Sequence, residues 1–285
     1  MLIAARTVVP RGLPRAAGLG TCASTSRMAL QVERVPCLSD NYVWLVHEPL
    51  SKLTAVVDPA EVQPVVAALK SKGWQLSHIW NTHHHWDHTG GNKQLKQLFP
   101  DIQVLGPAAD KARIPAIDVA VADGGTFQFG GVEVRVFDTP GHTRGHIVFW
   151  APQASALFSG DTLFALGCGR LFEGSPAQMW HSLSKLLPLP DETQVFCAHE
   201  YTQSNARFAV AVDPGNAALR LRKDEVDKLR AQGLPTVPSS LGEEKATNPF
   251  LRPHDAGIRS CLGVGPEASD VEVFTRLRHA KDSFH

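Results

Sequence analysis

The sequence carries a dense run of polar side chains at Thr82-His83-His84-His85-Trp86-Asp87-His88. Four of its side chains are metal donors within six consecutive residues: His83, His85, Asp87 and His88. Imidazole and carboxylate groups are the ligands that Zn²⁺ and neighbouring first-row ions prefer. A catalytic zinc usually takes three protein ligands and keeps one position open, so four donors in one loop are too many for one metal. The stretch therefore predicts a hydrolase site for two metals that activate water.

Three further donors stand in similar places elsewhere in the chain. His142 follows an alternating run at 132–137, Asp161 follows an apolar run at 156–159, and His199 follows a third β-rich run. Because each donor comes after a strand and a turn, all of them can converge on one edge of a layered fold. Seven donors are enough for two ions that share one bridging ligand.

Three neighbours of these donors are expected to play other parts. His84 and Trp86, at the intervening positions of the run, are expected to point away from the metals. His146, four residues after His142, is expected to support the ligands rather than to bind metal.

The pattern of apolar residues predicts an α/β fold, an αββα sandwich of two sheets under outer helices. The predicted strands are 42–46, 54–57, 76–80, 132–137, 147–150 and 156–159, and the predicted helices in this part are 62–72 and 176–187. After about His199 the β pattern stops, and helices are predicted at 205–212, 216–232 and 268–279. We therefore expect a metal-binding domain at 29–199 and a helical substrate-binding domain at 200–285.

With these donors the sequence resembles the metallo-β-lactamase superfamily, whose motif is HxHxDH followed by separated His, Asp and His. The resemblance implies two divalent metal ions, with zinc expected first and iron or manganese as alternatives. It assigns one ion to His83, His85 and His142, the other to Asp87, His88 and His199, and the bridge to Asp161. It also implies catalysis by a metal-bridging hydroxide that Asp87 and Asp161 orient.

Three other segments narrow the resemblance to the glyoxalase II family, the hydroxyacylglutathione hydrolases. These segments are 167–174, 198–202 and 278–282, and the run Asn248-Pro249-Phe250-Leu251-Arg252 adds to them. The resemblance extends from about Val35 to Phe284. It implies hydrolysis of the thioester S-D-lactoylglutathione, and of related S-2-hydroxyacylglutathiones, to D-lactate and glutathione, the second step of methylglyoxal detoxification.

Five residues are expected to contact the glutathione thioester: Arg170, Phe172, Tyr201, Arg278 and Lys281. Arg278 and Lys281 lie three apart on a predicted helix and can clamp a carboxylate, while Tyr201 can donate its hydroxyl. Many relatives carry Lys at position 170 and Tyr at position 172. Phe172 removes a hydroxyl donor, and the loss of one hydrogen bond weakens binding by about 0.5–1.5 kcal/mol.

Two alternatives use the same fold. A persulfide dioxygenase of the superfamily shares the HxHxDH run but holds a single Fe(II), and a non-catalytic relative would bind metal without turnover. The helical C-terminal region and the Arg278/Lys281 pair favour glyoxalase II over the dioxygenase. The full set of seven donors favours an active enzyme. A lactamase or a phosphodiesterase needs no glutathione clamp.

Residues 1–28 carry four arginines and no acidic residue, which is typical of an organelle transit peptide. A mitochondrial matrix protein is expected first, with a plastid form, or a cytosolic form that starts at Met28, as alternatives. Beyond this segment 24 basic residues face 28 acidic ones, a net charge of −4 that does not favour nucleic acid. No stretch is long enough to span a membrane. Five scattered cysteines indicate a reducing compartment, and a monomer is expected.

Overall fold

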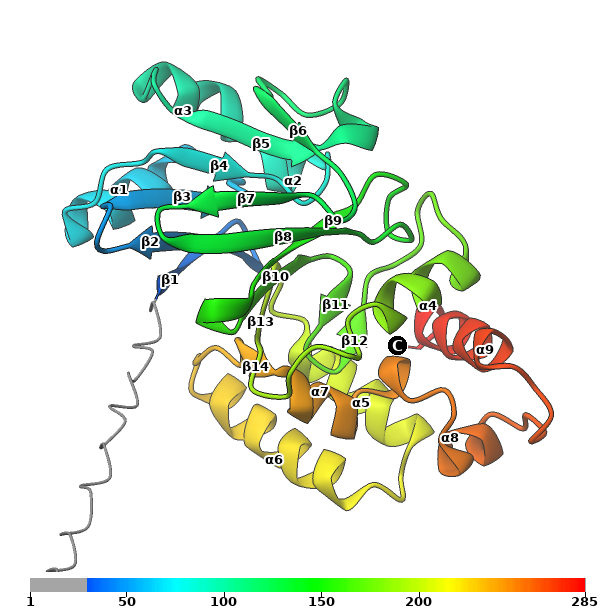
Figure 1. Cartoon of the computed structure of the whole chain (residues 1–285). Coiled ribbons are helices and arrows are strands. Elements are labelled where there is room, and N and C mark those ends of the chain that lie inside the picture. The colour runs from blue at the N-terminus through cyan, green and yellow to red at the C-terminus, as the bar shows by residue number, and fades with distance from the viewer. Residues whose placement is uncertain (1–29, 285) are drawn as a thin grey trace, which may run out of the picture.

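Two six-stranded β-sheets form the centre of the computed structural model, which describes residues 30–284 (Figure 1). The predicted leader at 1–28 lies outside the described residues. The first sheet runs in the order β1 (Gln31–Cys37), β2 (Asn41–Glu48), β3 (Leu53–Val57), β4 (His78–Trp80), β5 (Gln103–Pro107) and β6 (Val119–Val121). Its first three strands pair antiparallel, and β3 to β6 pair parallel.

The second sheet carries most of the strands that lead to the candidate site. It runs in the order β14 (Ser239–Ser240), β13 (Gln194–Cys197), β10 (Ala156–Gly160), β9 (Ile147–Ala151), β8 (Val132–Asp138) and β7 (Thr126–Phe129). The strands β7 to β10 pair antiparallel, and β13 lies parallel to β10. A separate short hairpin consists of β11 (Leu163–Phe164) and β12 (Gly167–Cys168).

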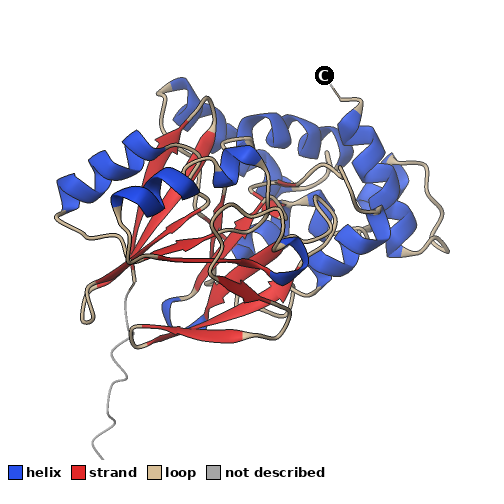
Figure 2. Cartoon of the chain, turned by 90° about the horizontal axis from the view of Figure 1, so that it is seen from above, coloured by secondary structure: helices blue, strands red, loops and turns tan. Residues whose placement is uncertain are grey.

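Helices cover the outer faces of both sheets, as Figure 2 shows. The helices are α1 (Val62–Lys72), α2 (Trp86–Thr89), α3 (Asn92–Leu98), α4 (Pro176–Ser184), α5 (Thr202–Val212), α6 (Ala217–Ala231), α7 (Leu241–Thr247), α8 (Ala256–Cys261) and α9 (Asp270–Asp282), with 3₁₀ turns η1 (Ala108–Asp110), η2 (Pro152–Ala154) and η3 (Pro249–Leu251). None of these helices combines the length and the apolar character that crossing a membrane requires. The predicted αββα sandwich is confirmed.

Strand β2 shows how the sequence builds these layers. Trp44 and Val46 belong to the core between the two sheets, whereas Val43 and Leu45 belong to the core between the first sheet and its helices. Successive side chains of a strand point to opposite faces, so the central residues of a strand that is covered on both faces are apolar, as they are in Val43-Trp44-Leu45-Val46. All eight residues of β2 are accordingly buried.

The structure differs from the predicted elements in several respects. Helix α4 ends at Ser184 rather than at residue 187, because Pro188 and Pro190 follow and oppose helix continuation. The prediction that strands stop after His199 was wrong, because β14 pairs with β13 inside the C-terminal region. The strands β1, β5, β6, β7 and β14 and the hairpin are also absent from the predicted set. Of these, β6, β14 and the two hairpin strands have only two or three residues, which is too short a pattern to recognise.

Phe149 offers a test of the core between the sheets. Its ring is fully buried and lies 5.5 Å from the ring of Trp80 and 6.1 Å from that of Phe127. Phe149→Ala is expected to lower the free energy of unfolding by about 3–5 kcal/mol, because it removes buried area and leaves a cavity. Urea unfolding measures this loss. The exposed Leu50→Ala should change stability by less than about 0.5 kcal/mol. A loss below about 1 kcal/mol for Phe149→Ala would contradict the described packing.

Candidate active site

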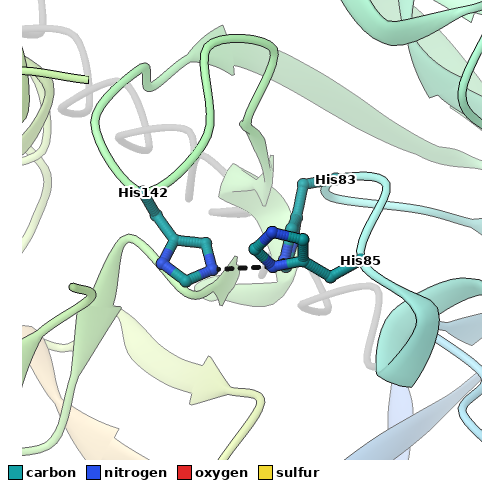
Figure 3. A group of neighbouring side chains, drawn as sticks. All are labelled: His83, His85 and His142. Carbon is teal, nitrogen blue, oxygen red and sulfur yellow. Dashed lines mark hydrogen bonds between the residues drawn. The ribbon is translucent and has the colours of Figure 1, made fainter. Parts of the chain in front are cut away.

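Three histidines from two loops bring their ring nitrogens together (Figure 3). Nδ1 of His85 lies 3.0 Å from Nε2 of His83 and 3.1 Å from Nε2 of His142. The first two come from the loop after β4 and the third from the loop after β8. Ligands about 2.0–2.1 Å from a tetrahedral zinc lie about 3.3 Å from each other, so these three nitrogens fit one ion.

A second group consists of Asp87, His88 and His199. Oδ2 of Asp87 lies 3.4 Å from Nε2 of His88 and 3.6 Å from Nε2 of His199. Asp87 and His88 lie in α2, whereas His199 follows β13. The structure therefore brings together both of the predicted ligand sets.

Asp161 stands between the two groups. Its Oδ2 lies 3.3 Å from Nε2 of His142, and its Oδ1 lies 3.5 Å from Nε2 of His88 and 3.4 Å from Nε2 of His199. Within the described chain, Oδ1 of Asp161 and Nε2 of His88 are buried without a hydrogen-bond partner. Buried polar atoms are normally satisfied, so these two atoms have the arrangement expected of metal ligands. The donors thus fit two ions bridged by Asp161.

Asp58 holds the loop of the predicted metal ligands in place. It accepts hydrogen bonds from the backbone N–H and the hydroxyl of Thr82, each at 2.7 Å, and Nδ1 of His88 lies 3.0 Å from its Oδ2. A carboxylate on the far nitrogen of a ligating histidine fixes the ring orientation and the tautomer. Sequence reasoning missed Asp58, although it follows β3 directly, the same strand-end placement that identified the ligands.

Residues 40 and 41 support the second group in the same way and were also missed. Nδ1 of His199 lies 2.8 Å from Oδ1 of Asp40, and Nδ2 of Asn41 donates to Oδ2 of Asp87 at 3.1 Å. Asp40 lies in the turn before β2, and Asn41 is the first residue of β2. No sequence pattern distinguishes these two residues from ordinary turn residues.

Three predicted neighbours of the ligands have different outcomes. His146 is confirmed as a supporting residue, because its Nε2 accepts the backbone N–H of Asp161 at 3.0 Å. The prediction that His84 points away is also confirmed, since its Nδ1 lies 3.0 Å from Oδ2 of Asp110. The same prediction for Trp86 was wrong: its indole is 70% exposed and lines the cavity described below. Alternation along a loop does not hold at Trp86, because α2 begins there.

The pKa values of the ligands follow from burial and from their neighbours. Burial lowers the pKa of His83 well below its usual range, and burial with the nearby His142 lowers the pKa of His85 to about 4. Burial opposes a charge on His88, but Asp161 and Asp58 outweigh it and raise its pKa. His83 and His85 are therefore neutral at pH 7, which is the state in which imidazole binds metal. His88 carries a proton in the metal-free protein, so a cation must displace that proton.

A cavity of about 710 Å³ opens beside these ligands. It is lined by five of the seven predicted metal ligands and by all five predicted substrate residues: His85, Asp87, His142, Asp161 and His199, with Arg170, Phe172, Tyr201, Arg278 and Lys281. The other two predicted ligands, His83 and His88, are buried and do not line it. Residues from both predicted domains thus share one cavity.

The predicted substrate residues differ in their burial and in the hydrogen bonds that they already make within the protein. Arg278 is only 3% exposed, and it donates to the backbone oxygen of Cys168 at 3.0 Å and to Oδ1 of Asp282 at 2.8 Å. Lys281 is partly buried and donates to the hydroxyl of Ser204 at 3.2 Å. A contact between Arg278 and a substrate carboxylate stays a prediction. The guanidinium that would make this contact is already hydrogen-bonded to Cys168 and Asp282.

Two aromatic residues pack directly on predicted metal ligands. The ring of Tyr201 stacks on His199 at 4.7 Å between centroids. Phe172 is 64% exposed, and its ring centre lies 5.2 Å from that of His142 and 5.7 Å from that of His85. Phe172 therefore shapes the cavity mouth next to the first ligand group.

Two family models match the chain. Residues 40–199 match the model described as "Metallo-beta-lactamase superfamily", and residues 200–284 match that described as "Hydroxyacylglutathione hydrolase C-terminus". The chain is 58% identical over 255 residues to the hydroxyacylglutathione hydrolase of Methylococcus capsulatus, covering 90% of this chain and 99% of the relative. It is 52% identical to that of Ruegeria pomeroyi, covering 90% of this chain and 100% of the relative.

More distant solved structures share the fold alone. The structure of ETHE1 from Myxococcus xanthus superposes with a TM-score of 0.63 at 22% identity, covering 88% of this chain and 90% of that chain. The BLEG-1 B3 metallo-β-lactamase superposes with a TM-score of 0.61 at 21% identity, covering 78% of this chain and all of that one.

Asp58 provides a test of the metal centre. Asp58→Asn keeps the shape but removes the charge beside Nδ1 of His88, so it should lower metal affinity about 10–100-fold. Competition with a chromophoric chelator at about pH 7 measures this affinity. The exposed Asp101→Asn serves as the control and should bind metal like the wild type. Equal affinities for Asp58→Asn and wild type would contradict the role of Asp58.

Proposed function

The chain belongs to the hydroxyacylglutathione hydrolase family of the metallo-β-lactamase superfamily, and on that premise we propose that it hydrolyses S-D-lactoylglutathione and related S-2-hydroxyacylglutathiones to the 2-hydroxy acid and glutathione. The observation that carries this proposal is the shared cavity, in which the metal ligands and the cationic side chains face one ligand-sized space. A thioester of a dicarboxylate peptide needs both features: hydrolytic chemistry at one end and carboxylate recognition at the other.

The metal ligands fit two divalent cations, for which we propose zinc, with iron or manganese as alternatives. When bound, such ions supply a hydroxide at neutral pH and polarise a carbonyl oxygen. Burial would raise the pKa of Asp161, but the facing His199, His88 and His142 lower it well below its usual range. The pKa of Asp87 is also lowered, because His88 and Asn41 outweigh its burial. Both carboxylates are therefore ionised at neutral pH and can orient an attacking water.

The other end of the cavity suits the peptide part of the substrate. Lys281 and Arg170 present positive charge to the cavity, and Tyr201 presents a hydroxyl whose pKa burial and Asp40 raise, so it stays a donor. Charged hydrogen bonds to carboxylates are stronger than neutral ones and favour an anionic peptide over a neutral thioester. Phe172 contributes an apolar surface beside the first ligand group in place of a hydroxyl.

A direct assay tests the proposed activity. Loss of thioester absorbance from S-D-lactoylglutathione, with release of free thiol, is expected from the metal-loaded wild type. Asp161→Ala should lower kcat by at least about 100-fold, because it removes the bridging ligand and the orienting carboxylate. Metal content is measured on the same preparations. Equal rates for both proteins would favour a non-catalytic relative, and one iron per chain with oxygen uptake on glutathione persulfide would favour a dioxygenase.

Lys281 gives the proposed activity a specific pH dependence. Burial, together with the positive charges of Arg278, Arg207 and Arg170, lowers the pKa of Lys281 to about 8. As pH rises through this value, the side chain of the free enzyme loses its charge. The kcat/KM for the dicarboxylate substrate should therefore fall above about pH 8, chiefly through a rise in KM.

Initial rates between about pH 6.5 and about pH 9.5, corrected for spontaneous hydrolysis, measure this profile. Lys281→Arg keeps its charge throughout this range and should remove the decline. A thioester that lacks carboxylates serves as a second control and should show no decline of this origin. The same decline in wild type and Lys281→Arg would exclude Lys281 as its cause.

A further inference from the structure

The hairpin formed by β11 and β12 is too short to hold its own shape. Each strand has two residues, and Ala165 and Leu166 join them. Even a longer two-stranded hairpin is marginally stable by itself. Leu166 also has φ +57°, a left-handed backbone conformation that is disfavoured for residues with a side chain. The rest of the protein must therefore supply the contacts that fix this hairpin.

These contacts come from polar side chains of the C-terminal region. Nδ2 of Asn248 donates to the backbone oxygens of Phe164 and Gly167, at 3.2 and 3.0 Å. Oε2 of Glu244 accepts the backbone N–H of Leu166 at 2.8 Å. Two further bonds complete the set, from Asn205 to the backbone oxygen of Ala165 and from Arg278 to that of Cys168. Each of the five consecutive residues 164–168 thus has a backbone group bonded to this region.

The supporting side chains are buried and paired with each other. Glu244 and Asn248 are fully buried. Oε1 of Glu244 lies 2.5 Å from Nη2 of Arg222, and its Oε2 lies 3.1 Å from Nδ2 of Asn248. Leu166 packs in a buried cluster with Ala206, Ala209 and Leu219 of the C-terminal helices. A buried charge is tolerated only with such complete pairing, and a fully bonded network fixes geometry.

The base of the hairpin contacts two metal ligands. Asp161 precedes β11 by two residues, and the N–H of Gly169 donates to the backbone oxygen of Thr162 at 3.4 Å. Nδ1 of His142 donates to the backbone oxygen of Arg170 at 2.8 Å. The fit is close, since a Cβ on Gly169 would lie 2.0 Å from the backbone oxygen of Asp161. A shift of the hairpin would therefore move both ligands.

We propose that Asn248 and Glu244 are positioning residues for the metal centre, acting through the β11–β12 hairpin on Asp161 and His142. The C-terminal region thus has a second role besides lining the cavity: it sets the geometry of the ligands that join the two metal sites. Figure 1 shows the hairpin between the second sheet and helices α5 and α7. The inference goes beyond the proposed thioester hydrolysis and rests on it only for the activity readout.

The substitution Asn248→Asp distinguishes a positioning role for the metal centre from a contribution to folding alone. Oδ1 of Asn248 accepts the N–H of Phe250 at 3.0 Å and caps η3, and aspartate keeps this acceptor. The substitution replaces the Nδ2 donor with an oxygen that faces two carbonyl oxygens and Glu244. It therefore opposes the hairpin contact while preserving the cap.

Asn216→Asp is the matched control. Oδ1 of Asn216 caps α6 by accepting the N–H of Leu219 at 3.1 Å. Its Nδ2 donates to Oδ2 of Asp213 at 2.9 Å and to the backbone oxygen of Ala246 at 3.0 Å. The same substitution thus removes the same kinds of bond in the same region, but none of these bonds involves the hairpin.

The readouts are the affinity for Co²⁺ by chelator competition, the visible absorption of the Co²⁺-loaded protein, and kcat and KM for S-D-lactoylglutathione. Asn248→Asp should lower Co²⁺ affinity about 10-fold, alter the absorption spectrum, and lower kcat about 10-fold with KM changed less than about 3-fold. Asn216→Asp should match the wild type in all four.

The proposal would be overturned if Asn248→Asp bound Co²⁺ with an affinity within about 2-fold of that of the control and showed the same absorption spectrum. It would also be overturned if kcat fell only in proportion to the loss of folded protein. A wild type without thioesterase activity would refute the proposed function, while the Co²⁺ measurements would still decide this inference. If Asn248→Asp does not fold, Glu244→Gln keeps the side-chain shape and should shift the same readouts in the same direction. Unchanged readouts for that variant would again overturn the proposal.

Discussion

A buried carboxylate shared between two groups of histidines is the interaction on which the rest of the structure depends. The two oxygens of Asp161 face His142 on one side and His88 with His199 on the other. A buried charge is costly unless it is compensated, so this residue requires positive groups on both sides. The fold meets that requirement by ending β4, β8, β10 and β13 at one edge, so that the loops after them carry the ligands.

The parts of this arrangement that are local in sequence could be predicted. The HxHxDH run is recognised from the spacing of its residues alone, and His142, Asp161 and His199 each follow a recognisable strand. The alternating side chains of β8 and the helical period of α1 allowed their limits to be placed to within a residue. These signals work because ligand loops are attached to regular elements whose patterns repeat over several residues.

The remaining features depend on contacts between residues that are distant in sequence. Asp58 and Asp40 orient predicted ligands 30 and 159 residues away. Asp58 follows a strand end and Asp40 lies in a turn, but neither placement shows which distant side chain the residue will contact. For Arg278, helix spacing identified the face shared with Lys281 but could not show that Cys168 and Asp282 already bond its guanidinium. The hairpin strands were too short to predict, and the contacts that support them come from Glu244 and Asn248, about 80 residues further along the chain.

The ligand set implies that two cations, held on either side of Asp161, are both needed for thioester hydrolysis. Titration of the metal-free protein with Zn²⁺, while the hydrolysis of S-D-lactoylglutathione is followed, tests it most directly. The two-metal site predicts that activity reaches its plateau at about two equivalents of zinc per chain. A plateau at about one equivalent, or a fully zinc-loaded protein that does not hydrolyse the thioester, would contradict it.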